Sequence, residues 1–304
     1  MNYKENEINK QYKLNKVKDK SLYLFSLILV LIGTFLMVFP YFYMIITALK
    51  TPQEMLSGSI LKNFWPSNPV WSNFLDVFRG NERYSKDVFN FLDSFWNTLK
   101  IEILVVPIGT FFSSLAAFSF AKMKFRGKNI ILIILLSSMM IPFAAVMLPQ
   151  YRAFYSLGMV NTLWPLIIPG LFGNTGMMLF LITSMKNNIP DSLIEESKVE
   201  GASYFKTYYK VALPLIKPAL VAQMLFWFVG IYNDFFGPSI YLTDPKIKTV
   251  QVAIMTLNST ASQASTDIPF LMASAFISSL PIILLFIFMN KSFVQTNISD
   301  GIKG

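Results

Sequence analysis

The sequence contains no cysteine and no histidine among its 304 residues. Disulfides, thiolate nucleophiles and imidazole groups, which are common metal ligands and general bases, are therefore excluded. Because cysteine is absent, its usage gives no indication of the redox compartment. Charge is also scarce, since Asp, Glu, Lys and Arg make up only 14% of the chain.

Apolar residues take the place of these missing groups. The chain is 54% hydrophobic and its mean hydropathy is +0.49, which is too apolar for a soluble globular domain. The composition predicts an all-α integral membrane protein, with the lipid bilayer as its surroundings.

The net charge of +9 raises the question of a nucleic-acid partner. The basic residues concentrate in the N-terminal tail and in one short loop, however, which is the pattern that membrane topology produces. We therefore expect no nucleic-acid partner. The first apolar run is much longer than that of a signal peptide and lacks a convincing small-residue cleavage site, so it should stay attached.

Six charge-free windows are candidates for membrane-spanning helices, because about 20 helical residues cross the hydrocarbon layer. The window between Lys217 and Asp234 is short for a bilayer. It can be a span only if the Lys217 side chain reaches the interface and Asp234 is shielded by protein. The windows lie between Lys20 and Lys50, Glu102 and Lys122, Lys128 and Arg152, Arg152 and Lys186, Lys217 and Asp234, and Asp267 and Lys291.

The distribution of lysine and arginine predicts the orientation. Basic residues before position 21, and the link holding Lys122, Lys124, Arg126 and Lys128, should be cytoplasmic. Six crossings then place both termini inside. This divides the chain into a basic cytoplasmic tail (1–20), a six-helix domain (21–290) and a cytoplasmic C-terminal tail (291–304). Within the domain we expect external loops at about 50–95, with short helices, and at about 233–267, and a cytoplasmic elbow at about 187–217.

The elbow carries the most informative local signals, PDSLIEESKVEGASYFKTYYKVALPLIKP at 190–218. Pro190 suits a first helical position, and Ser192 with Glu195 has the capping-box spacing. Gly201 stands where a helix needs a left-handed residue to stop. Ser203 can cap a second helix that carries one face of larger residues, namely Tyr204, Phe205, Tyr208, Tyr209 and Ala212. From these residues alone, a solvated connector and a DNA-binding helix-turn-helix both remain open.

Catalytic signals are missing. No phosphate-binding loop of the form GxxxxGK[ST] occurs, and the glycine-rich run GLFGNTG at 170–176 lies within an apolar span, where helix packing or bending explains it. We expect no catalytic residue, no metal site and no cofactor in this chain.

Two charged positions near the spans remain ambiguous. Glu102 and Lys100, at the expected outer entry of the second span, are two residues apart and so should not share a helix face. Asp234, next to Asn233, is either a functional group in or near the membrane or a cap for the short fifth span.

The elbow resembles a known signature. The order Glu195-Glu196-Ser197, then Gly201, then Leu213-Pro214 is similar to the Glu-Ala-Ala…Gly…Leu-Pro pattern of binding-protein-dependent ABC importer permeases. Glu196 and Ser197 depart from the two alanines usual there. From about residue 21 onward, TPQEM, YNDFFGPSIYLTD at 232–244 and the C-terminal SFVQTNISDGIKG further resemble the smaller permease of carbohydrate importers such as the maltose system, although Tyr232 replaces a usual tryptophan.

This resemblance implies a type I ABC importer permease in the bacterial cytoplasmic membrane. Its elbow would dock into a separate ATPase that binds the ATP and Mg. Glu195 would pair with a basic partner residue, Gly201 would set the angle, and Pro214 would mark the rise into the next span. The implied coupling set is Leu193, Glu195, Glu196, Ser197, Val199, Gly201, Tyr204 and Pro214, with Asn233 and Asp234 as the candidate translocation path.

The implied partners are a second permease, two ATP-binding subunits and an extracytoplasmic sugar-binding protein. Two rivals stay open. A secondary carrier or channel without ATPase partners could use Asp234 or Glu102, although the sequence shows no convincing inverted halves. A membrane-anchored scaffold or sensor would need no coupling elbow.

Overall fold

The computed structural model describes residues 2–56, 64–79, 90–264 and 268–301, and all regular secondary structure in these ranges is helical. The all-α fold class is thereby confirmed. The predicted external loops lie partly outside the described ranges, because residues 57–63, 80–89 and 265–267 are not covered. The described part of the first loop contains two short helices, α2 (Pro52–Leu56) and α3 (Ser72–Arg79).

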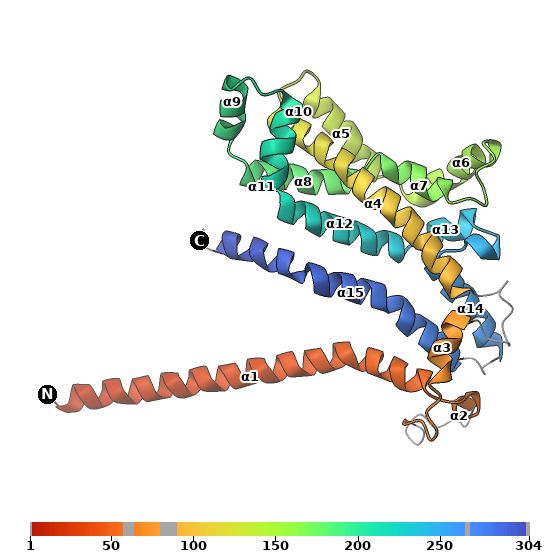
Figure 1. Ribbon diagram of the computed structural model, residues 1–304. Coiled ribbons are helices and arrows are strands. Elements are labelled where there is room, and N and C mark those ends of the chain that lie inside the picture. Colours follow the sequence, from red (N-terminus) through yellow and green to blue (C-terminus); the bar gives the residue numbers. More distant parts are fainter. Residues whose placement is uncertain (1, 57–63, 80–89, 265–267, 302–304) are drawn as a thin grey trace.

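The longer helices form a slanted bundle from which the first helix diverges (Figure 1). The backbone of the expected basic tail continues this first helix, and the backbone of the expected C-terminal tail continues the last one to Gly301. The principal helices are α1 (Asn2–Ala48), α4 (Phe91–Lys122), α5 (Lys128–Met139), α6 (Phe143–Ser156), α7 (Trp164–Leu171), α8 (Thr175–Asn188), α12 (Lys217–Tyr232), α14 (Val250–Ala264) and α15 (Ile268–Gly301).

Within the described ranges, four helical segments are long and apolar enough to cross a membrane, and the number rises to six if two bent helix pairs each form one span. The unbroken segments are Leu22–Ala48, Phe91–Lys122, Trp164–Asn188 and Ile268–Met289. The bent pairs are Lys128–Met139 with Phe143–Ser156, at 93°, and Tyr204–Leu215 with Lys217–Tyr232, at 80°. Six crossings and their orientation therefore stay a prediction.

Proline accounts for both bends. Pro142 precedes α6 with extended backbone angles (φ −67°, ψ 142°) and cannot donate the hydrogen bond that would continue α5. At the second bend the helix breaks at Ile216 (φ −100°, ψ 9°), between Pro214 and Pro218. Both pairs turn sharply, and the predicted span between Lys217 and Asp234 corresponds to α12 alone, the second helix of its pair.

The second span corrects a prediction about Glu102. The charge-free window placed this residue at the outer entry of the span, but α4 begins eleven positions earlier, at Phe91, so Glu102 lies inside the helix. Its side chain is 2% exposed. Lys100 is exposed, so the expectation that the two charges occupy different faces is confirmed. A window bounded by charges fails here because a carboxyl group packed between helices does not end a span.

The largest core cluster positions the elbow. Helices α4 and α8 supply one wall of it, through residues such as Phe118, Leu181 and Met185. Ile194 and Tyr208 from the elbow pack into the same cluster. Figure 1 shows α9 (Asp191–Val199) at the end of the bundle opposite α3 and α14. The elbow thus lies at one end of the bundle, and its inner face packs against this apolar core.

Candidate functional site

The first half of the elbow is helix α9, which begins at Asp191. The predicted capping box is wrong, because the N-cap is Pro190 (φ −60°, ψ 141°) and no side chain caps the helix. Ser192 is exposed and lies inside the first turn. Proline's restricted φ favours an extended residue before the helix, so the chain enters α9 two positions earlier than a serine cap requires.

Gly201 ends α9 as predicted. It is left-handed, with φ +77°, and an added Cβ would meet nothing within 4 Å. The amide of Ala202 donates to the Ser197 carbonyl at 2.9 Å, and the Gly201 amide donates to the Lys198 carbonyl at 2.9 Å. This pair of bonds is the Schellman motif, which satisfies the terminal carbonyls and turns the chain sharply.

The second half of the elbow starts with α10 (Tyr204–Thr207). Ser203 caps it as predicted, accepting a 3.3 Å hydrogen bond from the Lys206 amide. A π-helical turn, η1 (Tyr208–Ala212), and α11 (Leu213–Leu215) follow. The predicted single face is wrong, since Tyr208 and Ala212 are fully buried while Phe205 and Tyr209 are 58% and 64% exposed. The π turn adds a residue per turn and so disturbs the helical spacing that the prediction assumed.

Lys122 ties the elbow to the membrane domain. Its ammonium group donates to the Ile189 carbonyl at 2.6 Å and to the Asp191 carboxylate at 2.7 Å. The Lys122 side chain is 4% exposed, whereas that of Asp191 is 80% exposed. The hydrogen bond from Lys122 and its positive charge lower the pKa of the Asp191 carboxyl. The last residue of α4 therefore holds both the end of α8 and the start of α9.

The elbow's inner face is anchored in the core. Ile194 and Ser197 are buried, and the Ser197 hydroxyl donates back to the Leu193 carbonyl at 2.8 Å. Farther along, the Tyr208 hydroxyl lies 2.6 Å from the Ser114 hydroxyl of α4. Burial of this face and the Tyr208–Ser114 contact hold the elbow against α4 and α8.

The outer face presents charge beside apolar surface. Glu195 and Glu196 are exposed, and Val199 is 90% exposed. Tyr204 is 43% exposed, and the Lys198 ammonium lies 4.8 Å from its ring centroid, which links the two helices of the elbow by a cation–π contact. The extra charge of Glu196 thus points away from the core.

The remaining members of the predicted coupling set divide between the two faces. Ser197 is buried and Leu193 half-buried, so the outer surface consists mainly of Glu195, Glu196, Val199 and Tyr204. Pro214 is exposed in α11, two positions before the helix break at Ile216. A face with carboxylates around a bare valine and a tyrosine is suited to a partner that offers basic groups around an apolar cleft.

The second predicted region separates into two environments. Asn233 lines a cavity of about 330 Å³ between α1, α12, α14 and α15, and it accepts a 3.1 Å hydrogen bond from the Gln251 amide. The lining contains no charged side chain and comprises Tyr41, Tyr232, Asn233, Gln251, Ile254, Ala275, Ser278, Ser279, Ile282 and Ile283. Asp234 does not line this cavity.

Asp234 instead caps the short helix α13 (Phe236–Tyr241), because its carboxylate accepts a 3.2 Å hydrogen bond from the Gly237 amide. A Cβ at Gly237 would come within 2.8 Å of the other carboxylate oxygen. The sequence offered Asp234 as a cap for the short fifth span, but this carboxylate bonds the start of α13, the helix that follows that span.

Sequence reasoning missed Lys122, Tyr208 and Gln251 as positioning residues. Lys122 was used only as a marker of topology, and its partners are far away in sequence. The interrupted apolar pattern around Lys210 could have indicated an irregular turn near Tyr208. Gln251 carries no local signal, since it meets Asn233 only through tertiary packing.

Comparisons with known proteins agree with this architecture. Residues 109–297 match the model of the family described as binding-protein-dependent transport system inner membrane component. The chain is 26% identical to the arabinooligosaccharides transport system permease protein of Halalkalibacterium halodurans, over 89% of this chain and 92% of that protein. It is also 26% identical to the galactooligosaccharides transport system permease protein of Bacillus subtilis, over 95% and 98% of the two chains.

Its fold is similar to a chain of a bacterial ABC transporter involved in the import of the acidic polysaccharide alginate. The TM-score is 0.75 at 19% identity, over 91% of this chain and 98% of that one. A second structure, of a bacterial alginate ABC transporter in complex with an alginate pentasaccharide-bound periplasmic protein, gives a TM-score of 0.58 at 17% identity, over 91% and 95%.

Proposed function

Because the chain belongs to the family of inner membrane components of binding-protein-dependent transport systems, we propose that it is the permease subunit of an ATP-driven carbohydrate importer. In this proposal the protein spans the bacterial cytoplasmic membrane six times, with both termini inside, and forms part of the translocation path. The elbow at 187–217 faces the cytoplasm and couples that path to a separate ATPase.

The two-faced elbow carries this proposal. Its inner face is fixed to α4 and α8 through Lys122, Ile194 and Tyr208. On its outer face, Glu195 and Val199 are exposed and have no covering element in the described part of the chain. An ATPase cleft with basic residues around an apolar floor would complete that face, and closure of the ATPase dimer would then displace the elbow and its helices as a rigid body.

The proposed complex contains a second permease, two ATP-binding subunits and an extracytoplasmic sugar-binding protein. ATP and Mg belong to the ATPase subunits, and this chain acts without a cofactor and without catalysis. ATP binding would open the path toward the binding protein, and hydrolysis would reset it. Support comes from the family, and from a fold neighbour that belongs to an alginate ABC transporter in complex with a periplasmic protein.

An oligosaccharide is the proposed cargo, because relatives of similar length are permeases for arabinooligosaccharides and galactooligosaccharides. The cavity at Asn233 fits this chemistry, since amides, hydroxyls and tyrosine rings bind sugars through hydrogen bonds and ring contacts. Asn233 is the proposed contact of the path, while Asp234 supports it by fixing α13.

One observation favours the rival, a secondary carrier. Glu102 is buried in α4, and neither of its carboxylate oxygens has a hydrogen-bond partner among the residues that the structure describes. A buried carboxyl group in a membrane helix is a candidate for proton coupling. The two functions differ in energy source, because ATP depletion stops an ABC importer directly whereas collapse of the proton gradient stops a proton-coupled carrier.

The deciding experiment is purification of the full chain from membranes of its source cells and identification of an ATPase subunit that copurifies with it, followed by measurements of ATP hydrolysis and sugar uptake in vesicles. Glu195→Gln should preserve the amount of protein in the membrane and reduce coupled uptake at least several-fold. Asp76→Asn, which removes one carboxylate at the opposite end of the bundle, is the matched control. Full uptake by Glu195→Gln, or uptake that persists without ATP, would refute the coupling role.

A further inference from the structure

The loop that joins α4 to α5 is the most basic short segment between two apolar helices of the chain. Its cationic side chains are Lys122, Lys124, Arg126 and Lys128, and no acidic residue separates them. Lys122 is already engaged by Ile189 and Asp191. Lys124 and Arg126 are exposed and make no hydrogen bond or salt bridge to the described part of the chain. Lys124 and Arg126 therefore remain available to bind an anionic group from outside the chain.

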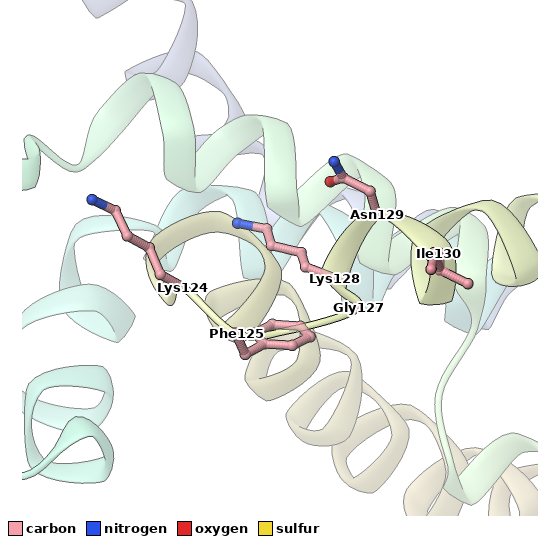
Figure 2. A pocket seen from close by; sticks show the side chains of 6 residues that line it. All are labelled: Lys124, Phe125, Gly127, Lys128, Asn129 and Ile130. Atoms are coloured by element: carbon pink, nitrogen blue, oxygen red, sulfur yellow. The ribbon is translucent and has the colours of Figure 1, made fainter.

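A shallow cavity of about 430 Å³ lies at this loop, lined by Lys124, Phe125, Gly127, Lys128, Asn129 and Ile130. Figure 2 shows Lys124 and Lys128 extending from the backbone in the same direction, with the Phe125 ring on the other side. The Lys128 ammonium donates to the Met123 carbonyl at 3.1 Å, which fixes its position. Two of its three protons remain for another acceptor.

An apolar stripe on α5 begins at the wall of the cavity. Ile130 belongs to its wall, and Ile133 and Ile134 follow at helical spacing on α5. These three side chains are 66%, 62% and 61% exposed. The opposite side of α5 packs inward, because Leu132 and Leu135 join the core cluster with α8. A cationic pocket thus opens onto a row of side chains that hydrocarbon can cover.

The geometry points to a binding site for an anionic phospholipid at this loop. The headgroup phosphate would lie between Lys124 and Lys128, and an acyl chain would run along Ile130, Ile133 and Ile134. Charge complementarity selects an anionic over a zwitterionic headgroup, and the adjoining stripe selects a lipid over a soluble phosphate. A loop between two apolar helices lies at a membrane surface whichever side it faces, so the inference does not depend on the orientation.

One acidic group competes for this charge. Asp191, at the start of the elbow, is attracted by Lys124 as well as by Lys122. Because Asp191 already has Lys122 at 2.7 Å, a phosphate can take Lys124 without leaving that carboxylate unpaired. The site therefore lies next to the elbow without using its anchoring contact.

The test is native mass spectrometry of the purified full chain, released from nanodiscs that contain equal amounts of phosphatidylglycerol and phosphatidylcholine. We expect retained phosphatidylglycerol to exceed phosphatidylcholine. Lys124→Gln with Lys128→Gln should lower this preference by about fivefold for each lysine. The control, Lys246→Gln with Lys248→Gln, removes the same charge between α13 and α14 and should keep the preference. Equal retention of both lipids, or equal losses in both variants, would overturn the site.

Two further measurements separate the possible occupants. Excess glycerol phosphate should fail to displace phosphatidylglycerol, and full displacement would show a soluble-anion site instead. Ile133→Ser with Ile134→Ser should weaken lipid retention without changing the charge, and unchanged retention would contradict the acyl-chain contact. Displacement of the lipid by the ATPase subunit would identify the loop as a protein interface. Size-exclusion profiles and unfolding midpoints confirm that each variant is folded before these comparisons are made.

Discussion

Lys122 and Asp191 lie 69 positions apart in the sequence and meet at 2.7 Å, so the end of α4 and the start of α9 are locked together. The same ammonium group holds the carbonyl of Ile189, which is buried. The pair differs from an ordinary surface ion pair because the cation is almost fully covered while the anion is exposed. Its contribution to the stability of the fold therefore comes from the buried hydrogen bond to the Ile189 carbonyl as much as from the ion pair.

Replacing Lys122 by Met tests this anchor. The substitution keeps the apolar stem and removes both hydrogen bonds, leaving the buried Ile189 carbonyl without its ammonium partner. We expect the free energy of unfolding to fall by about 1.5–3 kcal/mol. Thermal unfolding of the purified protein measures the change. Lys186→Met, an exposed lysine in the last turn of α8, should have almost no effect, and equal shifts in the two variants would show that the anchor contributes nothing.

The Asp191 carboxyl predicts a specific pH dependence. Its folded pKa is lowered, chiefly by the hydrogen bond from Lys122, below the unfolded value of about 3.9. A lowered carboxyl pKa gives a stabilisation that is complete above the unfolded pKa and disappears as the pH falls through the folded pKa. The difference in unfolding midpoint between the wild type and Asp191→Asn should be constant near neutrality and shrink below about pH 4. A difference that stays constant down to the lowest measurable pH would contradict this assignment.

Gly201 and Gly230 form a matched pair for the elbow turn. A Cβ would meet nothing within 4 Å at either position, but only Gly201 is left-handed. Gly201→Ala should therefore destabilise the protein by about 1–2 kcal/mol through backbone strain. Gly230→Ala, inside α12, should be neutral or stabilising by about 0.5–1 kcal/mol. Unfolding midpoints that move in the same direction would show that the turn tolerates a side chain.

Tyr208 and Tyr209 offer a second matched pair. The Ser114 hydroxyl donates to the Phe111 carbonyl at 2.9 Å, so the Tyr208 hydroxyl is the donor in its 2.6 Å contact with Ser114. Tyr208→Phe should lower the stability by about 0.5–1.5 kcal/mol. Tyr209→Phe alters an exposed side chain and should leave the midpoint unchanged. If coupled transport is assayed as well, only the Tyr208 variant should weaken it.

Particular residues show how far sequence reasoning reaches. Gly201 and Ser203 were identified correctly because left-handed backbone and side-chain capping are local properties of four or five residues. The start of α9 was misplaced because Pro190 and Ser192 both offer acceptable local starts, and the Lys122 contact that favours the earlier one is non-local. Tyr209 was assigned to the wrong face because the π turn interrupts the periodicity on which the assignment rested.

Glu102 and Asp234 show the same division near the membrane. Charge counting treated Glu102 as the boundary of a span, while packing of α4 against its neighbours buries it inside the helix. Asn233 and Asp234 are adjacent in sequence at the end of α12, yet their side chains have different partners. Asp234 accepts a hydrogen bond at the start of α13, whereas Asn233 lines the cavity and bonds Gln251. Neighbouring residues at a helix end point in different directions, and only the surrounding helices decide what each one meets.

By itself, the sequence determined that this protein is helical, belongs in a bilayer and carries a glycine-hinged elbow between apolar segments. Composition and local hydrogen-bonding capacity suffice for these properties, because each depends on nearby residues. Only the tertiary structure decided that Lys122 holds the elbow, that Tyr208 anchors it to α4 and that the basic loop lies next to exposed isoleucine side chains of α5. Those contacts join residues that are distant in the chain, and their existence depends on how the helices bend and pack.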